Sequence, residues 1–252
     1  MIHGLTPLSA AQKTLLGLSK IEVNALLQLG IEVLKARNDG TYLIKLGQHT
    51  FTTKSDQPLE PGREYWAQMR QSKGGVIHLQ RLMPKPAMLK MADSLSFDLA
   101  LLENLAKKKD PAGGFRDHLL HQMAAATTKD SFQNLTQLLM SLHQGVVSLP
   151  IKEQGRPMLL QMRKKRQNRD LNQKSVEFYA AMSNIGPLVG VIIQTGSRKD
   201  LKLFLHYSKS IELLERNKES LHGFATVAIE QSPAAVKPFW DGEKATLLDI
   251  KG

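Results

Sequence analysis

Short apolar and β-branched runs alternate with polar positions and turn signals between residues 31 and 82. The runs are IEVLKA, TYLIKL, HTFTTK, EYWAQM and VIHLQRL. Turn-forming stretches such as Asn38-Asp39-Gly40 and Lys73-Gly74-Gly75 separate them. Because closure removes exposed strand edges, about five short strands in so short a stretch predict a small closed barrel of the SH3 or oligonucleotide-binding type. We assign this barrel to residues 31–84.

Helical spacing replaces alternation over residues 85–145, after Pro84 and Pro86. Apolar residues there recur three and four positions apart, which is typical of one helix face. Three stripes follow this spacing: Leu95, Leu99, Leu102 and Ala106; Phe115, Leu119 and Met123; Phe132, Leu135, Leu139 and Leu142. The run Asp110-Pro111-Ala112-Gly113-Gly114 is interpreted as a break before the second helix, and Gly145 as the end of the third.

Strand character returns at Val146 with the runs VVSLPI and MLLQMRKK, followed by a polar loop. From Ser175 to Glu230 the order is strand, turn, strand, turn, strand, helix, glycine and strand. With residues 1–30 as a lead-in, the chain is predicted to be an α+β protein. It has a small N-terminal β-barrel-like unit (31–84), a helical middle section (85–145) and a C-terminal α+β module (146–252).

Alternation also predicts which strands are covered on one face and which on both. In EYWAQM it places one of Tyr65 and Trp66 in the core and the other in solvent. Around Gly190 both faces of LVGVII are apolar, which indicates a central strand covered on both sides. From Leu201 to Leu205 leucines alternate with more polar residues, which indicates a strand buried mainly on one face.

Composition narrows the class of protein. With 42% apolar residues, the 252-residue chain can build hydrophobic cores. It has no run approaching the roughly 18 apolar residues that span a bilayer, and the start MIHGLTPLSAAQ lacks the basic residues of a secretory signal. It contains no cysteine, which excludes disulfides, thiolate nucleophiles and cysteine-based metal sites. These features fit a cytoplasmic protein, and equally one exported unfolded through a narrow channel.

Positive charge is concentrated in one segment. The net charge is +11, and residues 151–174 carry eight basic side chains against Glu153 and Asp170. The densest stretch is Arg163 to Arg169, RKKRQNR. It is either a solvated hairpin tip or a docking site for an acidic protein or for nucleic acid phosphates. Because no aromatic residue is interleaved for base stacking, a protein partner ranks above nucleic acid.

No catalytic motif accompanies these features. The chain lacks G-x-S-x-G, a phosphate-binding loop, G-x-G-x-x-G and H-E-x-x-H. His118 and His121 could share a helix face, but no third ligand has matching spacing. Asp170 and Glu177 are interpreted as residues of polar loops. The sequence therefore predicts a protein that is not an enzyme and has no metal or cofactor.

Four segments carry a resemblance to a known family. They are MSNIGPLVGVII, LKLFLHYS, IELLERNKESLHG and FATVAIE. Their order resembles the C-terminal domain of flagellar hook-length control proteins, which has a Pro and Leu-Gly entry, two short strands, a helix with spaced leucines, a glycine and a last strand. The resemblance covers under a quarter of the chain. The entry departs from the family, because Asn184-Ile185-Gly186-Pro187 replaces the usual order.

The resemblance implies a function by binding. Such proteins contact the switch protein of the flagellar type III export gate and change its substrates from rod and hook subunits to filament subunits. Residues 1–30 would then hold the export signal. We expect partner contacts at loop residues Asn184, Gly186 and Pro187, and at the basic side chains Arg163, Lys164, Lys165 and Arg166. The family's long Pro- and Gln-rich ruler is replaced here by the predicted barrel and helices.

A second hypothesis remains open from the residues themselves. The basic run, the sequence pI near 9.8 and a barrel of the oligonucleotide-binding type are also typical of a cytoplasmic nucleic-acid-binding protein. The two hypotheses differ in their dependence on salt. Phosphate binding weakens steeply as salt rises, whereas recognition of an export protein keeps a partly apolar contribution.

Overall fold

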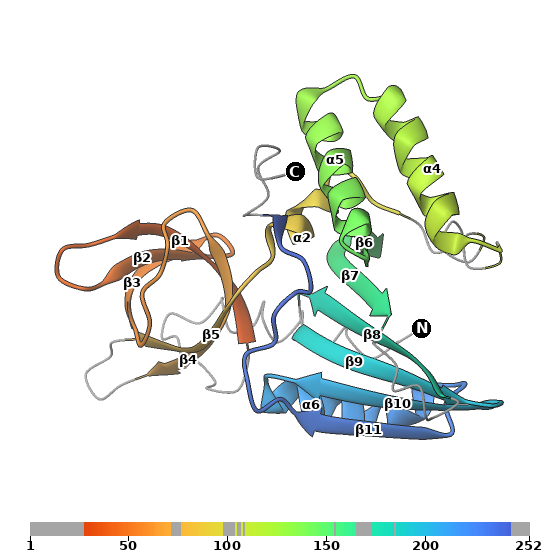
Figure 1. Cartoon of the computed structure of the whole chain (residues 1–252). Helices are drawn as coiled ribbons and strands as arrows, with labels where there is room; N and C mark the ends of the chain where they lie inside the picture. The colour runs from red at the N-terminus through yellow and green to blue at the C-terminus, as the bar shows by residue number, and fades with distance from the viewer. Residues whose placement is uncertain are drawn as a thin grey trace. The chain divides into compact units, whose positions relative to one another are not determined.

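The fold is α+β, with an N-terminal five-stranded barrel, helices in the middle and a C-terminal mixed sheet with a helix (Figure 1). The computed structural model describes residues 28–71, 77–97, 104, 107, 109–153, 155–164, 173–183 and 185–242. Residues 1–27 of the predicted lead-in, most of the first helical stripe and the basic residues Lys165 and Arg166 lie outside these residues, whereas residues 28–30 begin the first strand of the barrel. None of the described helices is long and apolar enough to cross a membrane.

The barrel closes in the strand order β1-β2-β3-β5-β4. Its strands are β1 (Gln28–Ala36), β2 (Tyr42–Leu46), β3 (His49–Ser55), β4 (Glu64–Gln71) and β5 (Ile77–Pro84). β3 and β5 pair in parallel, whereas the pairs β1–β2, β2–β3, β4–β5 and β1–β4 are antiparallel. The predicted closed barrel is confirmed, and its first strand begins at Gln28.

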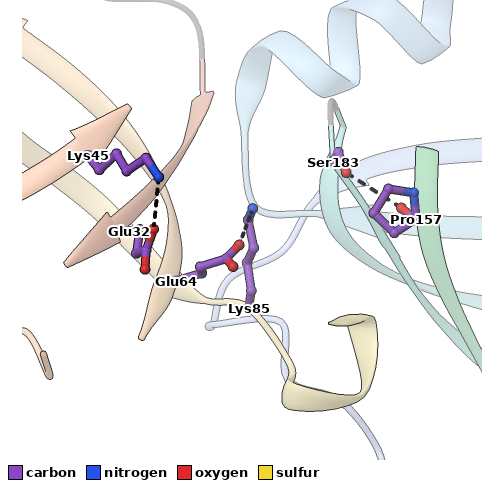
Figure 2. Close-up of polar contacts among 6 residues, drawn as sticks. All are labelled: Glu32, Lys45, Glu64, Lys85, Pro157 and Ser183. Atoms are coloured by element: carbon purple, nitrogen blue, oxygen red, sulfur yellow. Dashed lines mark hydrogen bonds and ion pairs between the residues drawn. The ribbon is translucent and has the colours of Figure 1, made fainter. Parts of the chain in front are cut away.

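The barrel core contains the inward-facing side chains of all five strands, including Ile31, Val33, Ile44 and Leu79. Where β4 begins and β5 ends, Lys85 pairs with Glu64 at 2.9 Å (Figure 2). The prediction for β4 is wrong, because Tyr65 and Trp66 are both buried, at 6% and 0% exposure. β4 is therefore covered on both faces rather than on one.

Three helices of the middle section are described: α2 (Ala87–Met91), α4 (Pro111–Ala124) and α5 (Lys129–His143). Asp110 caps α4, since its carboxylate accepts a 2.9 Å hydrogen bond from the Gly113 amide, and Pro111 stands in the first turn. The run from Asp110 to Gly114 thus begins a helix instead of only separating two. Gly145, at φ 77°, follows the end of α5 as predicted.

The third predicted stripe is only partly correct. α5 buries Leu135, Leu138 and Ser141, whereas Phe132 is 50% exposed. The buried face is therefore rotated from the predicted one. α5 packs against β6 and α2 against β6 and β7.

The C-terminal sheet has six strands in the order β11-β10-β9-β8-β7-β6. They are β6 (Val146–Glu153), β7 (Arg156–Lys164), β8 (Gln173–Met182), β9 (Gly186–Thr195), β10 (Arg198–Leu205) and β11 (Thr226–Gln231). β10 and β11 are parallel. The chain between them contains α6 (Ser208–Arg216) and the short 3-10 helix η1 (Lys218–Ser220), as a parallel connection requires.

Both predictions for strand burial in this sheet are confirmed. β9 lies inside the sheet, and around Gly190 the consecutive residues Gly190 and Val191 are buried on opposite faces, with Leu188 also buried and Val189 half-buried. In β10, Leu201, Leu203 and Leu205 are buried while Lys202 is exposed. Gly190 of β9 lies against the Phe178 ring, so closely that a Cβ atom there would collide with it.

The chain divides into two compact units that cut across the predicted domain boundaries. One contains Met1–Lys85, Asn184–Gly186 and Tyr207–Gly223, and the other contains Pro86–Ser183, Pro187–His206 and Phe224–Gly252. The helical section belongs to the unit of the sheet, because its helices pack on β6 and β7. α6, predicted as part of the C-terminal module, belongs to the unit of the barrel.

Candidate partner-binding site

The predicted contact residues at the entry to β9 are not an exposed loop. Gly186 and Pro187 are the first residues of β9, and both are buried. Ile185 before them is also buried, and Asn184 lies outside the described residues. Their placement in an exposed loop was therefore wrong for Gly186 and Pro187, whose backbone is already part of the sheet.

Local packing explains the glycine at position 186. Its φ is 80°, a left-handed conformation that other residues rarely adopt. A Cβ atom there would also lie 2.9 Å from the Tyr207 ring. Next to it, the Ser210 hydroxyl donates a 2.7 Å hydrogen bond to the Ile185 carbonyl. This entry therefore fixes the start of α6 within the first unit.

Tyr207 extends this contact to the barrel of the same unit. Its ring is fully buried, and its hydroxyl donates a 2.9 Å hydrogen bond to the Arg81 carbonyl. Burial raises the pKa of the Tyr207 hydroxyl above its usual value, so it remains a neutral donor. Arg81 has φ 51°, the one positive value among the described non-glycine residues. No sequence signal marked this pair.

The two predicted contact sets lie at opposite ends of the sheet. Arg163 and Lys164 end β7, whereas Gly186 begins β9. β7 and β8 are antiparallel, and β8 and β9 are neighbours joined by a short turn, so β7 and β9 run the same way. The end of β7 and the end of β9 therefore lie at the same end of the sheet, on either side of the start of β8, whereas Gly186 begins β9 at the other end. At the other end, Ser183 donates to the Pro157 carbonyl (Figure 2).

Five basic side chains share the end of the sheet where β7 and β9 stop and β8 and β10 begin. We call this group the basic end: Arg163, Lys164, Lys174, Arg198 and Lys199. Arg163 pairs with Glu177 at 2.8 Å, and Arg198 with Asp200 at 3.1 Å. The three lysines are exposed, and within the described part of the chain none of them forms an ion pair. Their uncompensated charge suits an acidic surface.

Comparison with known proteins gives this site no identity. No protein-family model, no curated protein and no solved structure matches the chain. What the basic end does must therefore be argued from its own residues.

Arg163 has a structural contact besides its charge. Its guanidinium lies 4.0 Å from the centre of the Phe239 ring, in a cation–π arrangement. Arg163 therefore packs and pairs within the fold, whereas Lys164 beside it is exposed. Removing Arg163 would remove both the ion pair with Glu177 and the contact with the Phe239 ring.

A buried polar residue, Gln161, holds the C-terminal segment around Phe239 and Trp240 on the sheet. Its side-chain amide donates to the Trp240 carbonyl at 2.7 Å and to the Ser148 hydroxyl at 3.1 Å. Its carbonyl oxygen accepts from the Phe239 amide at 2.9 Å. Ser141 completes the network, 2.6 Å from Ser148. Sequence reasoning missed this group, because a glutamine in an alternating strand predicts a solvent-facing position.

The two histidines weighed as metal ligands lie elsewhere. Both are on α4, and the His118 ring packs edge-on against Phe97, with 6.0 Å between the ring centres. Within the described ranges, no three His, Asp or Glu residues are grouped to hold a metal ion.

Proposed function

We propose that this chain is a flagellar assembly protein that acts as hook-length control proteins do. In this proposal it binds the switch protein of the flagellar type III export gate and changes which subunits are exported. The observation that carries it is the path of the chain through β9, β10, α6 and β11, with β10 and β11 parallel. These elements fall on the four segments that resemble the family.

The proposed mechanism is a binding event without bond chemistry. A ligand shifts a two-state partner only if it binds one state more tightly than the other. The basic end supplies that preference if the filament-exporting state of the switch protein presents an acidic surface. Lys164, Lys174 and Lys199 are the side chains best placed to contact that surface, because they are exposed and form no ion pair with another described residue.

Residues 28–84 do not serve as an extended ruler, because a closed barrel folds them into a compact body. The proposal therefore assigns the switching step, and no ruler, to the described residues.

Genetics tests this proposal in the source bacterium. Deleting the gene should give overlong hooks or missing filaments, and the full-length chain should restore them. A chain lacking residues 1–27, which stops before β1, should fail to restore them if those residues carry the export signal. Normal hooks and filaments in the deletion strain would refute the proposal.

A pair of matched variants locates the contact. Lys164→Glu/Lys174→Glu/Lys199→Glu reverses charge at the basic end, and should fail to complement the deletion. The control is Lys109→Glu/Lys129→Glu/Lys237→Glu, which makes the same charge change at exposed positions outside the basic end and the barrel. It should complement as the unaltered chain does. Equal failure of both would show that only net charge matters.

A further inference from the structure

The outer surface of the barrel has a covered side and an open side. On β4 and β5, Trp66 and Met83 are cross-strand partners at 0% and 4% exposure, although neither belongs to the barrel core. Residues on the outer faces of β2 and β3 are exposed, as Lys45, Thr50 and Thr52 show. A ligand of the barrel thus has access at β2 and β3.

Strand register places the open side's residues in rows. One row is Glu32, Lys45 and Thr50, and the next is Lys35, Leu43 and Thr52. Lys54 of β3 stands beside His78 of β5. Each of the two rows therefore contains one lysine and ends in one threonine on β3. Lysine ammonium groups and threonine hydroxyls are both common donors to phosphate oxygens.

The charge on this face is positive. Lys35 and Lys54 are exposed, and neither has an ion-pair partner among the described residues. The Lys45 ammonium lies 4.0 Å from the Glu32 carboxylate, and the two side chains are 50% and 41% exposed (Figure 2). An ion pair so exposed to solvent is weak. Arg37, exposed in the adjoining β1–β2 turn, adds a fourth cation.

The β1–β2 turn is ordered and holds its own acid. Asp39 accepts hydrogen bonds from the Thr41 hydroxyl at 2.6 Å and the Thr41 amide at 3.0 Å. These bonds hold the pKa of Asp39 below its usual value. The face therefore has four cations against two carboxylates, Glu32 and Asp39. One of those carboxylates is engaged within the turn.

We propose that this open face, formed by β1, β2 and β3, is a sequence-tolerant binding site for single-stranded nucleic acid. The strand order β1-β2-β3-β5-β4, with β3 parallel to β5, is that of the oligonucleotide-binding fold. Barrels of that fold bind oligonucleotides on β2 and β3 and on the loop between β1 and β2. The charge and the exposure coincide on those elements here.

The side chains also define how such a ligand is held. The exposed positions of this face offer no aromatic ring for stacking bases, so phosphate contacts dominate and sequence is not read. Leu34, 39% exposed, and Leu43 supply the apolar surface for sugars or bases. Binding should therefore weaken steeply as salt rises. This inference rests on the barrel and is independent of the proposed function of the sheet.

Fluorescence anisotropy with the full-length chain tests the site. The probe is a labelled thymidine oligonucleotide of about 15 nucleotides, within the range of site sizes known for such barrels. Lys35→Gln/Lys45→Gln/Lys54→Gln should bind about tenfold more weakly at low salt. Its slope of log K against log salt should be shallower by about 2, since each lost single-strand phosphate contact removes about 0.7.

The matched control is Lys164→Gln/Lys174→Gln/Lys199→Gln, which removes the same charge from the basic end. It should bind the oligonucleotide nearly as the unaltered chain does, and both variants should keep the parent melting temperature. Equal weakening in both variants, or a larger loss in the control, would overturn the proposal. So would displacement of the probe by polyglutamate as effectively as by unlabelled oligonucleotide, since that would indicate an acidic protein as ligand.

Discussion

The hydroxyl of Tyr207 donates a 2.9 Å hydrogen bond to the backbone carbonyl of Arg81. The residues are far apart in the sequence, yet both belong to the unit built around the barrel. Arg81 holds a left-handed backbone conformation that costs free energy in a non-glycine residue. The buried phenol therefore binds a carbonyl whose orientation depends on that conformation.

Replacing Tyr207 by Phe should destabilise the protein. The change leaves the Arg81 carbonyl without this donor, which costs about 1–3 kcal/mol when the acceptor stays buried. Urea unfolding followed by circular dichroism would measure the loss. Tyr42→Phe, at a half-buried barrel position, is the control and should change the free energy of unfolding by less than about 0.5 kcal/mol. An equal effect at both positions would contradict a special role for Tyr207.

Stability should fall in alkali. Burial raises the pKa values of Tyr179 and Tyr207, so both hydroxyls stay protonated in the folded protein while the unfolded chain ionises near pH 10. Their contribution is therefore complete below about pH 10 and is lost above it, by up to about 1.4 kcal/mol per pH unit for each tyrosine. Tyr179→Phe/Tyr207→Phe should flatten this decline in denaturant titrations. An unchanged slope in the double variant would refute the assignment.

Gly190 should not tolerate a side chain. A Cβ atom there collides with the Phe178 ring, so Gly190→Ala should cost about 1–3 kcal/mol of unfolding free energy. Phe178→Leu/Gly190→Ala should recover part of that loss, because the smaller side chain leaves room. Thermal unfolding of the two single variants and the double variant gives the coupling free energy between positions 178 and 190. Additive effects would mean that the two residues do not meet.

Gln161 should hold the C-terminal segment in place. Gln161→Leu removes the hydrogen bonds to the Phe239 amide and the Trp240 carbonyl and leaves the Ser148 hydroxyl with Ser141 alone, so we expect a loss of about 2–4 kcal/mol. Trp240 fluorescence should shift to longer wavelength, and the segment should become sensitive to protease. Gln133→Leu, on the exposed surface of α5, is the control. Intact protection in Gln161→Leu would show that other contacts hold the segment.

Local pattern was enough to predict the elements of this fold. The barrel strands and the burial of β9 and β10 follow from alternation, because each strand has a period of two and a face to bury. The start of α4 was predicted wrongly, because the run from Asp110 to Gly114 was interpreted as a break before the helix. The capping bond from Gly113 to Asp110 shows that the same residues begin α4.

Contacts between distant segments could not be predicted in this way. Gly186 was interpreted as a loop residue because Gly-Pro marks turns, whereas packing against Tyr207 makes it the first residue of a strand. Gln161 was missed because its partners lie on the C-terminal segment. The basic end combines residues of β7, β8 and β10. Only strand order shows that Arg163 and Lys199 share one end of the sheet.

Calorimetry with the full-length chain and the cytoplasmic domain of the export-gate switch protein tests the proposed function most directly. Transient interfaces often bury less than about 1,200 Å², so we expect a Kd of about 1–100 μM. Lys164→Glu/Lys174→Glu/Lys199→Glu should weaken binding at least about tenfold, and Lys35→Glu/Lys45→Glu/Lys54→Glu should leave it unchanged. Absence of binding by the unaltered chain, or equal weakening by both variants, would contradict recognition through the basic end.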